Sequence, residues 1–121
     1  MFEGENSKRY DLKDRTFEFA KDVRAFVRKL PTTISNIEDV KQLIRSSGSV
    51  GSNYIEANDL LSKKDFVMRA KICRKEAKES RYWLRLLYVD GKPDAGPLRD
   101  KLVQESTELM NIFGSIIRKS E

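Results

Sequence analysis

The 121-residue sequence contains no histidine and only one cysteine, Cys73. Without histidine, no Ser–His or Cys–His nucleophile, no histidine general base and almost no zinc or haem site can be built. A single cysteine excludes an internal disulfide and a cysteine-rich metal site. We therefore expect a protein with no catalytic residues, no metal ligands and no cofactor.

Long apolar runs are also missing from the sequence. No run approaches the roughly 20 residues needed to cross a bilayer, and the first ten residues lack the apolar core of a signal peptide. We therefore expect no contact with a membrane. The unpaired Cys73, at a helical core position, favours a reducing, cytoplasmic location.

Apolar residues recur at helical spacing in four segments joined by short links, and no segment alternates as a strand would. This pattern predicts an all-α, antiparallel up-down-up-down four-helix bundle over residues 14–121, preceded by a polar N-terminal segment, 1–13. We expect the first helix to begin near Asp14 and to end before Pro31. We expect the second to be capped by Ser35 or Asn36.

The second helix has an unusual middle, because the run 46–53 is made of Ser, Gly, Val and Asn. We predict that it stays helical, since the period continues on both sides, and that Gly51 allows another helix to approach closely. The third helix should begin after Ser62, with Asp65 completing a capping box, and should end at Gly91 as its C′ residue. The fourth should begin between Asp94 and Pro97.

The net charge of the protein, +5, is confined to the third helix. Residues 62–90 hold nine basic and four acidic side chains, whereas the rest of the chain holds fifteen of each. At 100° per residue the basic side chains form a stripe in which no aromatic residue is expected. The stripe is either a binding site for phosphate backbone or a solvated helix face. Its candidate nucleic-acid-binding residues are Lys64, Lys71, Arg74, Lys75, Lys78, Arg81 and Arg85.

Two further groups of residues are candidates for a subunit interface. A polar face of the second helix carries short side chains that permit close approach, and a flank of the third helix combines acids with Trp83. The alternatives are a plain solvent face for the first group and packing within the bundle for the second. The candidate interface residues are Arg45, Ser49, Asn53, Glu56, Glu76, Glu79 and Trp83.

Three segments resemble the 23S rRNA intervening-sequence proteins, a family of four-helix bundles. The segment 42–57 resembles the family's signature helix, and 62–66 and 75–84 are similar to its third helix. The resemblance implies a ring-like homopentamer without established enzymatic activity. It also implies a relation to the accessory bundle proteins of diversity-generating retroelements, which bind nucleic acid and work with a reverse transcriptase. The motif residues matched here are Arg45, Ser49, Gly51, Asn53, Glu56, Asp65, Phe66, Glu76, Glu79 and Trp83.

Two hypotheses about function follow. In the first, a non-enzymatic homo-oligomer, a pentamer by the resemblance, binds the backbone of RNA or DNA through the basic stripe of the third helix. In the second, the protein is a scaffold that docks a protein partner, such as a reverse transcriptase, and does not bind nucleic acid itself.

Overall fold

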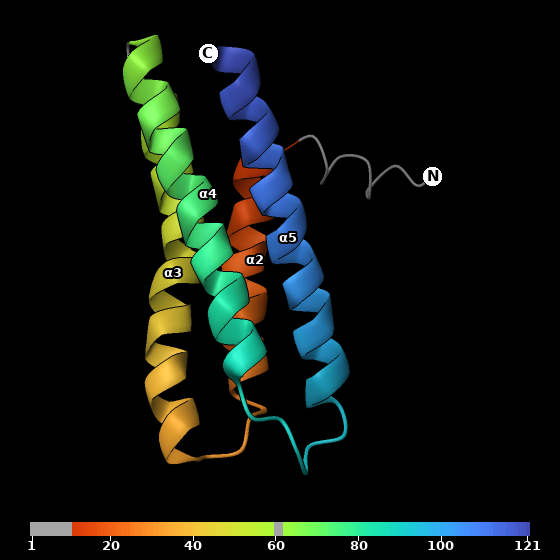
Figure 1. The fold of residues 1–121 in the computed structure, drawn as a ribbon. Helices are drawn as coiled ribbons and strands as arrows, with labels where there is room; N and C mark the ends of the chain where they lie inside the picture. The colour runs from red at the N-terminus through yellow and green to blue at the C-terminus, as the bar shows by residue number, and fades with distance from the viewer. Residues whose placement is uncertain (1–10, 60–61) are drawn as a thin grey trace.

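Four antiparallel helices make up the part of the chain that the computed structural model describes, residues 11–59 and 62–121. Each helix runs opposite to its neighbours, so the chain goes up and down the bundle (Figure 1). Both α2 and α4 pack on α3 and on α5. The predicted all-α four-helix bundle is therefore confirmed. The helices are α2 (Leu12–Val27), α3 (Ile34–Asn58), α4 (Lys63–Leu86) and α5 (Ala95–Ser120).

Side-chain caps fix the start of three helices. The backbone N–H of Asp14 donates to the Asp11 carboxylate at 3.1 Å, so α2 begins two residues before the predicted start. Residues 1–10 of the predicted polar segment lie outside the described residues. The expected capping by Ser35 or Asn36 is wrong, because Thr33 caps α3. The predicted start of the third helix after Ser62 is confirmed, since the Ser62 hydroxyl accepts from the Asp65 N–H at 3.0 Å. Among the described residues, the Asp65 side chain makes no bond back to the Ser62 N–H, so the predicted capping box is only half formed.

The predicted end of the third helix at Gly91 is wrong, because α4 ends at Leu86. The buried Asn36 side chain accepts from the Tyr88 N–H at 2.9 Å and donates to the Tyr88 carbonyl at 2.8 Å. These bonds hold the backbone of Tyr88 outside the helix. Gly91 instead lies in the following turn, where its φ of 83° is one that glycine adopts without strain. The fourth helix begins at Ala95, as predicted.

The core is a single column of apolar side chains along the axis of the bundle, extended by a small cluster around Val67. Tyr54 meets Phe113 edge to face, with the ring centroids 5.8 Å apart. Within the described residues, no helix has both the length and the apolar character needed to cross a membrane. The largest fully buried apolar side chains are Phe19, Phe113, Leu43, Leu84 and Leu109.

Small side chains bring α3 close to both of its neighbours. The hydroxyls of Ser46 and Ser80, both fully buried, lie 2.8 Å apart between α3 and α4. On the α2 side, a Cβ atom at Gly51 would lie 2.9 Å from the Thr16 Oγ1. The run 46–53 is helical throughout. The predictions of a continuous helix and of a close approach at Gly51 are both confirmed.

We predict that Gly51→Leu lowers the free energy of unfolding by about 1–3 kcal/mol or more, because the larger side chain must push α2 and α3 apart. Gly48→Ala is the matched control on the same helix. Its Cβ would meet only the end of the flexible Arg24 side chain, at 3.4 Å. The control should therefore gain up to about 1 kcal/mol from helix propensity. Urea denaturation followed by circular dichroism measures both, and equal stability of the two variants would contradict the close approach.

Candidate nucleic-acid interface

The outer face of α4 carries most of the predicted phosphate-binding side chains. Their spacings of three, four and seven residues place them in line along the helix. Their exposure leaves the charges accessible to a ligand, as the hypothesis of a phosphate-binding stripe requires. The residues of this outer stripe are Lys64, Lys71, Lys75, Lys78 and Arg85, all exposed.

Within the part of the chain that the structure describes, two cations of the outer stripe make ion pairs. Lys71 lies 3.3 Å from the Glu121 carboxylate, and Lys75 lies 3.9 Å from Glu79. These are exposed contacts, which contribute little to stability and are easily exchanged. Among the described residues, no acid lies within ion-pair distance of Lys64, Lys78 or Arg85. The stripe therefore retains uncompensated positive charge.

The other two predicted cations, Arg74 and Arg81, lie toward α5. Arg81 is half-buried and donates to the Thr107 hydroxyl at 3.3 Å, so it supports the contact between α4 and α5. Arg74 lies over Gly114 together with Arg118 of α5, since a Cβ at Gly114 would come within 4.0 Å of both guanidinium groups. The positive surface thus extends from α4 onto α5. Arg118 was not among the predicted site residues, although a glycine inside an amphipathic helix is a signal of close approach.

A pocket of about 580 Å³ lies at one end of the outer stripe, where α4 begins and α5 ends. Three lysines and one carboxylate, that of Glu121, line it together with the apolar side chains of Val67 and Met68. Such a site favours an anionic group that has an apolar part. The polar residues of its lining are Lys63, Lys64, Lys71, Ser120 and Glu121.

The expectation that no aromatic residue lies in the stripe is wrong. Tyr82 follows Lys78 by four residues and precedes Arg85 by three, which places it on the same face of α4. Its side chain is 59% exposed. The available signal in the sequence was the helical spacing of Tyr82 from Lys78 and Arg85.

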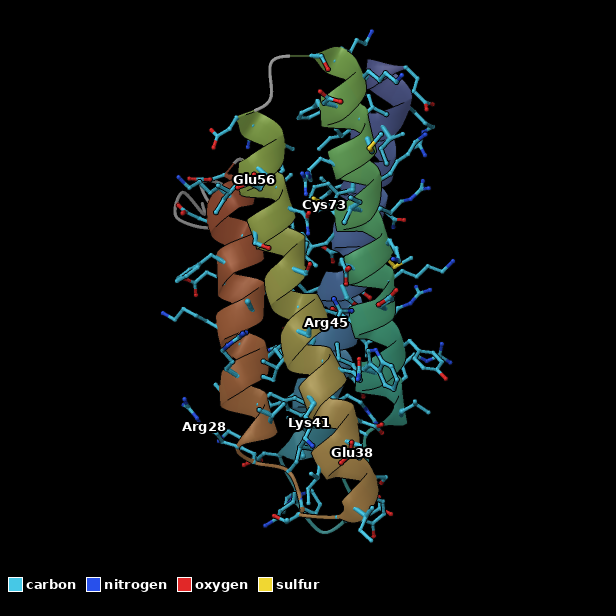
Figure 2. All side chains as sticks on the ribbon, turned by 90° about the vertical axis from the view of Figure 1, so that its left-hand side faces the viewer. Arg28, Glu38, Lys41, Arg45, Glu56 and Cys73 are labelled. Carbon is cyan, nitrogen blue, oxygen red and sulfur yellow. The ribbon has the colours of Figure 1, made fainter. Side chains whose placement is uncertain are left out.

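The candidate interface residues lie along the seam between α3 and α4. Arg45 points from α3 toward α4 (Figure 2) and donates to Glu76 at 3.2 Å and to Glu79 at 3.1 Å. The Glu76 side chain is only 9% exposed, whereas that of Arg45 is 53% exposed. In this cluster the Glu76 carboxylate is therefore buried, whereas the Arg45 guanidinium remains accessible to solvent.

The remaining interface candidates differ in their surroundings: some bond between α3 and α4, one is exposed and one packs against the core. Asn53 donates to the Ser49 hydroxyl at 2.9 Å and accepts from Arg69 of α4 at 2.9 Å. These bonds join α3 to α4 within one chain. Glu56 is exposed near the end of α3, and Trp83 is half-buried against the core.

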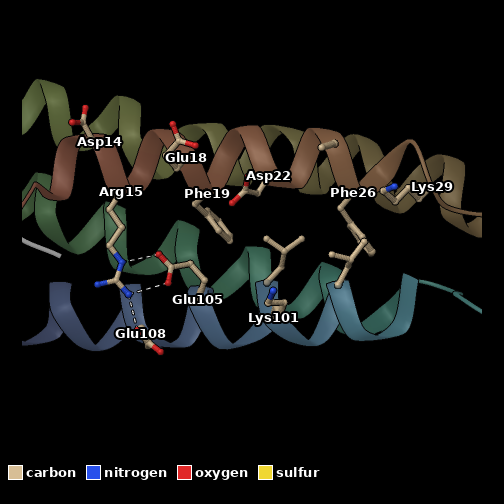
Figure 3. Close-up of a pocket in the computed structure, with 13 residues that line it drawn as sticks. Asp14, Arg15, Glu18, Phe19, Asp22, Phe26, Lys29, Lys101, Glu105 and Glu108 are labelled. Atoms are coloured by element: carbon tan, nitrogen blue, oxygen red, sulfur yellow. Dashed lines mark hydrogen bonds and ion pairs between the residues drawn. The ribbon is translucent and has the colours of Figure 1, made fainter. Parts of the chain in front are cut away.

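A groove of about 890 Å³ separates α2 from α5 on the other side of the bundle (Figure 3). Its floor includes Phe19, Phe26, Leu98 and Leu102. This groove was not predicted from the sequence, because its walls come from the first and last helices. Its charged rim consists of Asp14, Arg15, Glu18, Asp22, Lys29, Lys101, Glu105 and Glu108.

Arg15 spans this groove and joins α2 to α5. Its guanidinium donates to both oxygens of Glu105, at 2.7 and 2.9 Å, and to Glu108 at 2.6 Å. The hydrogen bonds that Arg15 donates to Glu105, ahead of the one it donates to Glu108, raise the pKa of Arg15. Hydrogen bonds from Gln104 and then Arg15 lower the pKa of Glu108. Arg15 therefore remains a fixed cation, and Glu108 stays ionised to lower pH than an isolated carboxyl.

The described residues offer little covalent chemistry. Burial raises the pKa of the Cys73 thiol to about 12, so the reactive thiolate is scarce at neutral pH. Among these residues, no group of three or more Cys, Asp and Glu side chains is placed to hold a metal ion.

Comparison with known proteins gives a family and a solved structure. The model of the 23S rRNA-intervening sequence protein family matches residues 8–112. A crystal structure of a protein of unknown function from the S23 ribosomal protein family of Bacteroides thetaiotaomicron VPI-5482 is 31% identical in sequence, with a TM-score of 0.71. The match covers 87% of this chain and 96% of that one. A search of the curated proteins gave no match.

We predict that Arg15→Met lowers the free energy of unfolding by about 1–3 kcal/mol at pH 7, because it leaves two carboxylates without their charged donor. Lys13→Met, an exposed change on the same helix, is the control and should have little effect. The part of wild-type stability due to the lowered pKa of Glu108 is present above the ordinary carboxyl pKa and is lost as the pH falls through the lowered value. Arg15 causes part of this lowering, after Gln104, so the gap in stability between wild type and Arg15→Met should narrow at acidic pH. A gap that stays constant in urea denaturation down to pH 3 would contradict this account.

Proposed function

We propose, from the premise that this chain belongs to the 23S rRNA-intervening sequence protein family, that it is a non-enzymatic nucleic-acid-binding protein. Its ligand is the phosphate backbone of RNA or DNA, and its binding surface is the outer stripe of α4. Binding of this kind tolerates sequence variation and weakens with salt, because its energy comes from counterion release. A cytoplasmic location is part of the proposal.

One observation carries the proposal. Lys64, Lys78 and Arg85 are exposed on α4 and have no acidic partner among the described residues. The segment 62–90, which contains α4, holds the whole net charge of the protein. A helix face that is merely solvated does not require the net positive charge to be concentrated on one helix of the four. Arg74 and Arg118 widen the positive surface toward α5.

We further propose that the protein assembles into a homo-oligomer, a pentamer by its resemblance to the family, through the seam between α3 and α4. In support, the Arg45 guanidinium stays half-exposed while it holds Glu76 and Glu79. A ring would present several copies of the outer stripe to one strand. Several weak phosphate contacts would then add up to a useful affinity.

A second candidate function is docking of a protein partner, such as the reverse transcriptase that the resemblance to retroelement accessory proteins implies. The groove between α2 and α5 favours it, because an apolar floor bordered by five acids and three bases suits a basic amphipathic segment. This groove and the outer stripe of α4 lie on different helices. Variants can therefore separate the two functions.

We predict that the triple variant Lys71→Glu, Lys75→Glu, Lys78→Glu loses at least about tenfold in affinity for RNA and DNA at low salt, and that its salt dependence becomes shallower. The loss follows from the removal of three phosphate contacts and the repulsion of three new carboxylates. Fluorescence anisotropy with labelled strands measures both quantities.

The control for this variant is Lys13→Glu, Lys41→Glu, Lys101→Glu, which changes the net charge equally but spares α4. It should bind nearly as wild type. Equal losses in the two variants would show that only net charge matters. If the scaffold function holds instead, the α4 variant keeps its protein partner and wild type binds no nucleic acid.

We predict that Trp83→Ala and Glu79→Ala weaken the assembly, because both change the seam between α3 and α4. Light scattering coupled to size exclusion measures the mass. Phe17→Ala, which removes an exposed aromatic side chain on α2, should leave the mass unchanged. A wild-type protein that elutes as a monomer would contradict the assembly itself.

A further inference from the structure

We infer that Tyr82 is a stacking platform for an unpaired base, so that α4 binds single-stranded nucleic acid in preference to duplex. This inference rests on the proposed function, and it adds the class of ligand. Within the outer stripe, Tyr82 is the one side chain that offers an aromatic ring rather than a charge.

The position of Tyr82 fits a ligand in which phosphates and bases alternate. At 1.5 Å per residue, Tyr82 lies about 6 Å along the axis from Lys78 and about 4.5 Å from Arg85. Neither of these cations has an acidic partner among the described residues. A strand that places phosphates on the two cations brings the base between them to the ring of Tyr82.

The ring of Tyr82 is held in place before any ligand binds. It meets the ring of Trp83 at a centroid distance of 5.1 Å and an interplanar angle of 81°. Trp83 in turn packs against the core. An edge-to-face contact can cover at most one face of Tyr82, and the side chain remains 59% exposed. A fixed ring with a free face loses little conformational entropy on binding.

The chemistry of this surface selects an unpaired strand. In a duplex both faces of each base are stacked on neighbouring bases, so an aromatic side chain on an exposed helix face cannot reach them without unstacking the bases. A single strand can offer both its phosphates and its bases. Stacking on aromatic side chains is how sequence-tolerant single-strand binders add affinity to charge. Because RNA and DNA share these groups, the stripe should accept either.

The test compares wild type, Tyr82→Leu and Tyr82→Trp in anisotropy titrations with unstructured strands of about 16 nucleotides, in RNA and DNA forms, and with the matching duplexes. We expect wild type to prefer single strands. Tyr82→Leu should lose about 5- to 100-fold in affinity for them, the range for removing one stacked base, and should change less than about twofold on duplexes. Tyr82→Trp should retain single-strand binding.

Two controls accompany this test. The first uses only the wild-type protein, and the second is a matched tyrosine variant. A DNA strand with abasic sites keeps its phosphates, so wild type should bind it more weakly than the intact strand, by a factor close to that of Tyr82→Leu. Tyr88→Leu removes a similarly exposed tyrosine that lies beyond the end of α4, and it should bind as wild type.

The outcomes separate the inference from the proposed function. Equal loss of single-strand and duplex binding in Tyr82→Leu, no loss at all, or equal binding of intact and abasic strands would overturn the stacking role while leaving phosphate binding intact. A changed oligomeric mass in Tyr82→Leu would instead assign the ring to a subunit contact. If wild type binds no strand at low salt, both the proposed function and the inference fail.

Discussion

The position of α4 depends on how closely α3 approaches its neighbours. Ser46 and Ser80 bring α3 and α4 together through a hydroxyl contact of 2.8 Å, and Gly51 lets α3 rest on Thr16 of α2. Larger side chains at these positions would separate the helices, because packed interiors do not absorb extra volume easily. At this separation Arg45 can reach Glu76 across the seam. The core face of α4 is thereby fixed, and with it the direction of its charged outer face.

Most of the fold could be predicted from the sequence, because helical periodicity and the Ser62 cap are local signals. The helix ends were harder to predict, since they depend on distant partners. Nothing near Leu86 in the sequence indicates the end of α4, which follows from the bonds that Asn36 makes to Tyr88. Helix propensity would have made the run 46–53 a loop. There the uninterrupted period of apolar and small residues was the better guide.

The candidate site was predictable to the extent that it lies on one helix. Spacing alone places Lys64, Lys71 and Lys78 in line. It does not show that Arg81 is occupied with Thr107 of α5. The groove between α2 and α5 could not be predicted from the sequence, because its floor is formed by residues from the first and the last helix. Arg15 illustrates the same limit, since its partners Glu105 and Glu108 lie 90 and 93 positions later in the sequence.

The confinement of the net charge to α4 also affects how the molecule meets a partner. Because residues 62–90 carry a net charge of +5 and the rest of the chain is neutral, the centre of positive charge lies off the molecular axis, and the protein is an electric dipole as well as a cation. The electric field of a polyanion orients such a dipolar protein before contact, so that its α4 side faces the polyanion. Encounters then start in the productive orientation, and ionic strength controls the association rate in addition to the equilibrium affinity.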